Sequence, residues 1–316
     1  MDPNGSRRAV ASAAPVVVGI DGSRAAARAA EWAAAEALSR DLPLRLVQVV
    51  PDLDKPAFRP GGVKYRAASE TLARTRRSIT EALPRTGAAP QPGGPQQPEE
   101  PRRLEIDVAV LRGRPDQLLL ERSESAELMV LGRPDTGFLS QMVLGDTALA
   151  VTRDAHCPIA LVPPTRVEHG AVLAVADTAG PARAALATAA RAARTRGGEV
   201  TVARVWHGRS WQEHPDWTPE SAVVSDAELV HCVRQFPDVV IRPITLVGDP
   251  LTAVETLTAA ARLVVVAHES TFAHPDRLGR ITQELVRYAP CPVLVVPDRP
   301  PAAEQADADR TRQVAQ

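Results

Sequence analysis

The chain has 316 residues, of which 44% are hydrophobic and only 3% aromatic, and its 37 basic residues nearly balance its 38 acidic ones. This length predicts about two domains, and the net charge of −1 argues against a general nucleic-acid or anionic-membrane surface. No apolar run approaches the ~20 residues of a membrane span. Three cysteines without a CxxC pair indicate a reducing cytoplasm and provide neither a disulfide framework nor a zinc site.

The first half begins with a strand and an alanine-rich helix. Residues 1–14 are expected to form a disordered tail, and the apolar run Val16–Ile20 is typical of a buried parallel strand. Ser23 is expected to cap a helix that continues to about Ser39. The apolar stripe of this helix contains Ala30, Ala33, Ala34, Ala37 and Leu38, whereas the charged residues Arg28, Glu31 and Glu36 are placed elsewhere.

The next segments alternate between strand and helix. We expect a strand over 44–50, a helix over 64–83 and a third strand over 104–111. Between the last two, residues 84–101 are rich in proline and glycine, so they are predicted to form a flexible surface insertion. Pro115 suits the first turn of a third helix.

A loop with three glycines follows the fourth predicted strand, Leu128–Leu131, and opens a helix over residues 139–153. Such a loop at the carboxyl end of a buried strand is where an α/β fold binds phosphates, because glycine admits close backbone approach and helix N–H groups face the anion. A tight turn without a ligand explains the same residues equally well. A fifth strand is expected over Ile159–Val162, and Cys157 before it is expected to be a small buried hydrophobe.

The pattern then repeats. Val172–Asp177 follows Val16–Asp21 by 156 residues, Gly248-Asp-Pro follows Gly113-Arg-Pro by 135, and Cys291-Pro follows Cys157-Pro by 134. The drop from 156 to 135 places about 21 extra residues in the first copy, where the insertion lies. Two copies of alternating strands and helices imply parallel sheets covered on both faces. We therefore expect two α/β domains with doubly wound, five-stranded parallel sheets, over 15–164 and 169–298, and a second disordered tail over 299–316.

The order and spacing of these segments resemble the universal stress protein family in its tandem form. The likeness covers nearly the whole chain apart from the tails and the insertion. It rests on these segments: Val16–Ser23, Gly113–Pro115, Val130–Gly132, Leu144–Gly145, His156–Pro163, Gly248–Pro250 and Ala289–Pro297. The resemblance implies an adenine-nucleotide α-hydrolase-like fold. It also implies that the fifth strands, Ile159–Val162 and Val293–Val296, pair within the chain as a pseudo-dimer.

The resemblance also implies nucleotide-binding residues in the first domain. The aspartate after the first strand is Asp21, and the end of the second strand, which offers its backbone to adenine, falls at Val49. The phosphate loop of pattern Gly-x2-Gly-x9-Gly-Ser/Thr falls on Gly132 to Asp146. Gly132 and Gly145 match this pattern. Asp135 takes the place of the second glycine, with Gly137 nearby, and Asp146 takes the place of the hydroxyl residue.

These departures leave two hypotheses open. A carboxylate beside a phosphate weakens binding, unless Asp135 or Asp146 holds a bridging Mg²⁺. The first hypothesis is a cytoplasmic stress protein that binds ATP weakly in its first domain and does not act as an enzyme. The alternative is a regulatory or scaffold protein that has lost nucleotide binding in both domains and acts through protein partners. Self-association as a homodimer fits either hypothesis. A slow ATP hydrolase would need a base and an arginine finger, and the sequence offers no obvious set.

The second copy departs further from the nucleotide-binding pattern. Ala267 stands in place of the first loop glycine, and Arg280 in place of the hydroxyl residue. Its loop contains His268, Glu269, His274 and Asp276, which are metal ligands by type but lack a defined zinc spacing. We interpret this loop as a polar surface segment. It is expected to be a degenerate nucleotide site.

Overall fold

The computed structural model describes residues 13–83, 103–134, 145–165, 167, 169–177, 182–206, 227–247, 249–268 and 278–297. The first half contains β1 (Val16–Gly19), α1 (Arg24–Arg40), β2 (Leu44–Val50), a 3-10 turn (Pro56–Phe58), α2 (Val63–Ala82), β3 (Ile106–Arg112), α3 (Pro115–Ser123), β4 (Leu128–Gly132), α4 (Asp146–Asp154) and β5 (Ile159–Val162). The second half contains β6 (Ala171–Asp177), α5 (Ala182–Arg196), β7 (Val200–Trp206), α6 (Ala227–Gln235), β8 (Ile241–Val247), α7 (Pro250–Thr258), β9 (Ala261–His268), α8 (Arg280–Tyr288) and β10 (Val293–Pro297).

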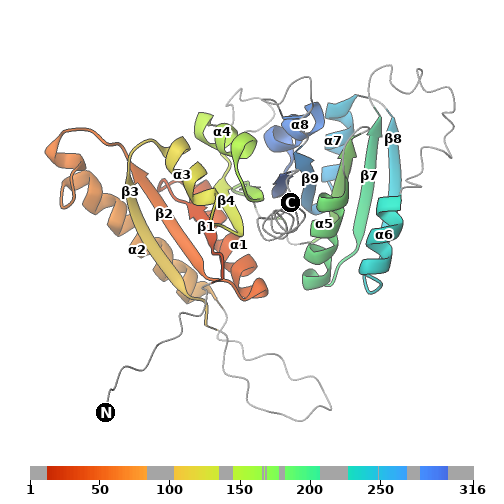
Figure 1. The fold of residues 1–316 in the computed structure, drawn as a ribbon, viewed down its shortest axis with the longest axis horizontal. Coiled ribbons are helices and arrows are strands. Elements are labelled where there is room, and N and C mark those ends of the chain that lie inside the picture. The colour runs from red at the N-terminus through yellow and green to blue at the C-terminus, as the bar shows by residue number, and fades with distance from the viewer. Residues whose placement is uncertain are drawn as a thin grey trace, which may run out of the picture.

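The strands of these described segments form one ten-stranded sheet, in the order β3-β2-β1-β4-β5-β10-β9-β6-β7-β8. All pairs within a half are parallel, and β5 meets β10 in antiparallel register, with Ile159 opposite Val295 and Leu161 opposite Val293. The two halves therefore lie on either side of this junction (Figure 1). Both the doubly wound order and the expected pairing of the fifth strands are confirmed. The pairing covers one edge of each half-sheet, which would otherwise expose unpaired backbone groups.

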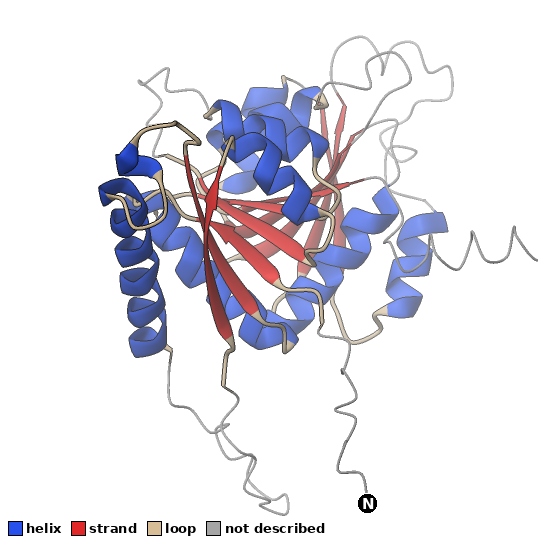
Figure 2. Ribbon diagram, turned by 60° about the vertical axis from the view of Figure 1, so that its left-hand side comes forward, coloured by secondary structure: helices blue, strands red, loops and turns tan. Residues whose placement is uncertain are grey.

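Helices cover both faces of the sheet (Figure 2). One face packs against α1, α2, α5 and α6, with Leu46, Leu72 and Leu186 among the buried side chains. The other face packs against α3, α4, α7 and α8, with Leu119 and Leu285 in its core. Because both faces of the central strands are buried, these strands are continuous apolar runs rather than alternating ones.

The start of α1 follows the sequence prediction. The Ser23 Oγ accepts a hydrogen bond from the Ala26 N–H at 3.1 Å, which satisfies one of the free donors at the helix start. The predicted alanine stripe is buried, with Ala30, Ala33 and Ala37 fully inaccessible to solvent. In a chain with so few aromatic residues, these small side chains let the helix approach the sheet closely.

Glu36 was expected to lie away from the buried stripe, and this prediction is wrong. Its side chain is only 4% exposed. One carboxylate oxygen accepts from Arg40 at 2.8 Å, and the other pairs with Arg196 at the end of α5. The helical period placed Glu36 correctly on α1 but could not show that α5 of the second half covers this position. Glu36 therefore joins the two halves through an ion pair.

Arg133 makes a second connection between the halves. It follows β4 and is 5% exposed. Its guanidinium donates to the Arg287 carbonyl at 2.7 Å, and also to the Val286 and Ala289 carbonyls. These carbonyls lie at the C-terminal end of α8, where backbone acceptors lack intrahelical partners and where a positive charge is favourable.

His268 occupies the corresponding position in the second half, since it follows Ala267 as Arg133 follows Gly132. We expected it in a polar surface loop, but it is the last residue of β9 and only 8% exposed. It lies near the end of α4: hydrogen bonds from Arg153 and, to a smaller extent, the charge of His268 lower the pKa of Asp154. Glu269, His274 and Asp276 lie outside the described residues. Within the described part of the chain, no three His, Cys, Asp or Glu residues form a group able to hold a metal ion.

Cys157 and Cys291 are buried, as expected for small hydrophobic residues. Burial raises the pKa of each thiol to about 12, so the thiolate is rare near neutral pH and both residues are poor nucleophiles. No helix in the described segments is long and apolar enough to cross a membrane.

Several expected segments lie partly or wholly outside the described residues. The helix predicted over 139–153 is described from Asp146 to Asp154. The insertion predicted at 84–101 falls outside, as do nearly all of the two predicted tails. The third strand begins two residues later than predicted, at Ile106, where pairing with β2 starts.

Candidate functional site

A cavity of about 960 Å³ lies at the carboxyl ends of the first-half strands. It is bounded by the ends of β1, β2 and β4 and by the first turns of α1, α3 and α4. In a doubly wound sheet, ligands bind where adjacent strands send their helices to opposite faces. Here β1 leads into α1 on one face, and β4 leads toward α4 on the other. The cavity therefore lies at the topological switch point.

Asp21 and Ser23 shape the loop between β1 and α1. The Asp21 Oδ1 accepts a hydrogen bond from the Ser23 N–H at 2.8 Å, which forms a tight turn before the helix. Ser23 then caps α1, so the N-terminal end of α1 opens into the cavity. Asp21 is exposed and lines the cavity, as the resemblance implies.

Gly132 and Gly145 both line the cavity but serve different purposes. A Cβ at Gly132 would lie 2.4 Å from the Ala25 carbonyl carbon and 2.5 Å from the Ala26 nitrogen. Gly132 is therefore required so that β4 can pack against the first turn of α1. Gly145 is the N-cap of α4, and a Cβ there would meet nothing within 4 Å. Packing alone thus explains the glycine at 132 but not the one at 145.

The charged groups at the cavity are mixed in sign. Asp146 is the first residue of α4, where its carboxylate is favoured by the helix dipole but opposes a phosphate. Arg24, the first residue of α1, is exposed and lines the same cavity. Thr147 follows Asp146 in the lining and supplies a hydroxyl one position after the one that the family pattern expects.

The opposite wall of the cavity is apolar. Val47, Val49, Leu119 and Leu131 line it, together with Pro115. A volume of several hundred Å³ with apolar walls and a few polar groups is typical of a cofactor site. This wall suits a flat aromatic base, and the helix N-termini with Arg24 and Thr147 suit an anionic group.

The structure brings together five of the residues that the resemblance implied: Asp21, Val49, Gly132, Gly145 and Asp146. Asp135 and Gly137 lie outside the described residues. The sequence analysis missed Arg24 and Thr147. Arg24 carried a signal, because a cation directly after an N-cap is unfavourable for the helix dipole and so suggests another role.

The corresponding region of the second half differs. Ala267 occupies the position of Gly132 and is 7% exposed. The described part of α5 begins at Ala182. Gly279 caps α8 as Gly145 caps α4.

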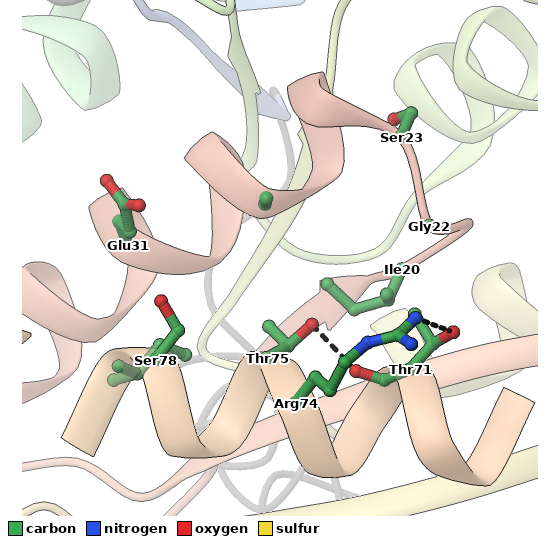
Figure 3. A pocket seen from close by; sticks show the side chains of 10 residues that line it. Ile20, Gly22, Ser23, Glu31, Thr71, Arg74, Thr75 and Ser78 are labelled. Carbon is green, nitrogen blue, oxygen red and sulfur yellow. Dashed lines mark hydrogen bonds between the residues drawn. The ribbon is translucent and has the colours of Figure 1, made fainter. Parts of the chain in front are cut away.

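A smaller cleft of about 230 Å³ lies on the far side of α1, between α1 and α2. Figure 3 shows Glu31 on α1 on one side of this cleft and Ser78 and Thr75 on α2 on the other. Arg74 is held along α2 by a hydrogen bond to the Thr71 hydroxyl at 3.2 Å. The hydroxyls of Thr71 and Thr75 already bond to backbone carbonyls within α2, and the cleft is much smaller than the cavity at the strand ends.

Comparisons with known proteins agree on one family. The profile of the universal stress protein family matches residues 14–163 and 169–297. Universal stress protein Rv2028c of Mycobacterium tuberculosis is 28% identical over 284 residues, which cover 89% of this chain and 95% of the relative. Universal stress protein Rv2624c of the same organism is 35% identical over 147 residues, or 46% of this chain and 47% of the relative.

The comparison of folds finds a solved structure that is similar to both halves together. The crystal structure of a universal stress protein from Archaeoglobus fulgidus aligns with a TM-score of 0.67 at 16% identity, covering 91% of this chain and 99% of that one. Since the family profile matches two successive regions that together span most of the chain, this protein belongs to the universal stress protein family and consists of two tandem family domains.

Proposed function

We propose that this protein acts by binding rather than by catalysis, and that the cavity of its first half binds an adenine nucleotide weakly. The observation that carries the proposal is the cavity itself: an apolar wall lies opposite two helix N-termini at the switch point of the sheet. Membership of the family agrees with this, because the resemblance already implied adenine-nucleotide binding at these positions.

In this proposal, Val49 and Leu119 contact the base, and Asp21 contacts the nucleoside. The N–H groups at the start of α4, with Thr147 and Arg24, hold the phosphates. Gly145 leaves room for the chain to approach them. Mg²⁺ bound to the phosphates would reduce repulsion by Asp146, and this carboxylate is the group in the described lining best suited to contact the metal.

The first prediction is that ATP·Mg²⁺ binds to the purified protein and that Asp21→Ala weakens binding at least tenfold. Calorimetric titration measures this directly, after mass spectrometry of small molecules released from the protein. Because Asp21 also shapes the turn before α1, thermal unfolding of the variant serves as the control for its fold. Absence of heat at millimolar ATP in the native protein would contradict the proposal. A phosphate-release assay that stays silent supports action by binding.

The second prediction concerns Asp146. A carboxylate about 5 Å from a phosphate charge costs roughly 0.8–3 kcal/mol, depending on the local dielectric. In the absence of Mg²⁺, Asp146→Asn is therefore expected to tighten ATP binding by roughly fourfold to over a hundredfold. Asp146→Ser, which adds the hydroxyl of the family pattern, is expected to tighten it at least as much.

The matched control for Asp146 is Asp238→Asn, which removes the same charge from an exposed turn of the second half. It should leave ATP affinity unchanged. If Asp146→Asn weakened binding in the presence of Mg²⁺, the carboxylate would be a metal contact rather than a source of repulsion. Titration without Mg²⁺ distinguishes these cases.

A second function is supported by the departures from the family pattern. Asp146 at the first cavity and Ala267 in the second half both oppose phosphate binding. In that case the protein is a regulatory or scaffold component whose two halves present a binding surface to a protein partner. We assign either function to a stress-response protein in the cytoplasm, with self-association as a further mode of action. The ATP titration decides between the two.

A further inference from the structure

A second large cavity lies at the junction between the two halves. It measures about 480 Å³ and shares only Thr165 with the cavity proposed for the nucleotide. The middle of α1 forms one side, and the end of α5 with the start of β9 forms the other. Trp32, Val162 and Pro292 provide apolar surface, so this is a mixed site rather than a purely charged one.

The charges that face this cavity do not balance. Arg28 pairs with Glu31, and both oxygens of Glu36 are taken by Arg40 and Arg196. Arg262 also lines the cavity, and within the described residues it forms no ion pair or hydrogen bond. Among the described residues of the lining, one guanidinium thus has no carboxylate partner.

A second observation also indicates an excess of positive charge. Burial and the charge of Arg262 together lower the pKa of Arg196 to about 10. Two guanidinium groups therefore lie close enough to repel each other in partly buried surroundings. Glu36 compensates Arg196 but also pairs with Arg40, so a further anion beside Arg262 would reduce this repulsion.

The internal repeat shows that this imbalance is specific to one side of the junction. Val16 pairs with Leu128 in the first half, and Val172 pairs with Leu263 in the second. Val172 is offset from Val16 by 156 residues, so Arg196 corresponds to Arg40. Leu263 is offset from Leu128 by 135 residues, so Arg262 corresponds to Glu127. The two sides of the junction are therefore related by the repeat, but one carries a glutamate where the other carries an arginine.

On the side of Glu127 a carboxylate acts on the neighbouring guanidinium groups. Burial lowers the pKa values of Arg40 and Arg191, and the charge of Arg40 lowers that of Arg191 further; the negative charge of Glu127 opposes this lowering at both residues. On the other side, Arg262 replaces this carboxylate and adds a positive charge. The cavity therefore has a cation at the position where the other half of the repeat has a carboxylate.

We propose that this cavity is a second ligand site, which binds a small organic anion with an apolar body and a carboxylate. The carboxylate pairs with Arg262, and the apolar body packs against Trp32, Val162 and Pro292. Because the lining comes from both halves of the chain, such a ligand connects α1 to the start of β9 and stabilises the junction. The proposal does not depend on nucleotide binding in the first cavity.

The test is NMR spectroscopy of the full chain labelled with 15N-tryptophan. Because the chain has four tryptophans, it gives four indole signals. Trp32→Phe assigns the signal of Trp32. We expect 1-naphthoate to shift the Trp32 signal saturably. The neutral 1-naphthamide has nearly the same shape, and we expect it to bind at least tenfold more weakly, because it cannot form the ion pair with Arg262.

Three variants make the test specific. Arg262→Glu restores the charge found at Glu127 and is expected to weaken naphthoate binding at least tenfold; Arg262→Gln provides a second variant if the first fails to fold. Arg234→Glu makes the same charge change on an exposed part of α6 and should leave binding unchanged. No shift of Trp32 at millimolar naphthoate, equal binding of the amide, or unchanged binding by folded Arg262 variants would each overturn the proposal.

Discussion

Replacing Glu36 by glutamine is expected to lower the free energy of unfolding by about 3–5 kcal/mol, because it breaks a buried ion pair and leaves positive charges uncompensated. The Glu36 side chain is 4% exposed, and its two oxygens are shared between Arg40 and Arg196. Without the carboxylate, Arg196 would face the like charges of Arg40 and Arg262 alone. The measurement is the shift in the chemical denaturation curve, with thermal unfolding as a second measure.

The control for this prediction is Glu31→Gln on the same helix. Glu31 pairs with Arg28 but is 42% exposed, so its removal should cost less than about 1 kcal/mol. If both variants were destabilised equally, burial of Glu36 at the junction would not be the cause. The comparison also tests whether the two halves depend on each other, since Glu36 belongs to the first half and Arg196 to the second.

Gly132→Ala is expected to destabilise the protein by about 3 kcal/mol or more. The new methyl group would lie 2.4–2.5 Å from backbone atoms of Ala25 and Ala26, and backbone atoms cannot move aside as a flexible side chain can. Either α1 must move away from β4, or the end of β4 must bend. Both changes separate walls of the nucleotide cavity, so we also expect loss of any ATP binding that the native protein shows.

Gly145→Ala is the matched control for Gly132. Position 145 has φ −56° and ψ 144°, which alanine adopts freely, and a Cβ there meets nothing within 4 Å. Its effect on stability should stay within about 1 kcal/mol. A similar loss of stability in both variants would show that loop flexibility, rather than packing against α1, explains the two glycines.

The secondary structure was largely predictable because it depends on short-range patterns. The apolar run at Val16, the cap at Ser23 and the proline at 115 each produced the element expected of them. The repeat predicted two similar parallel sheets, since the same order of strands and helices occurs twice and the offset changes mainly at the insertion. The resemblance then supplied the pairing of β5 with β10, which no local pattern contains.

The cavity was partly predictable. Asp21, Gly132 and Gly145 come together because parallel strands place their carboxyl ends at one edge of the sheet. The purpose of Gly132 was not predictable, because its close contact is with the backbone of a helix about 107 residues earlier in the chain. Arg24 and Thr147 were missed because the family pattern assigns them no role.

The sequence by itself determined the order of strands and helices, the tandem repeat and the position of the cavity, since these follow from local periodicity and from constant spacing. Only the tertiary structure decided the partners of Glu36 and Arg133 and placed Arg262 at the junction cavity without an ion-pair partner among the described residues. Each of these charged residues has the same local pattern whether it is exposed or buried. Whether the residue is buried depends on the other half of the chain, which covers it. The other half also decides whether an opposite charge or a hydrogen-bond acceptor lies beside it.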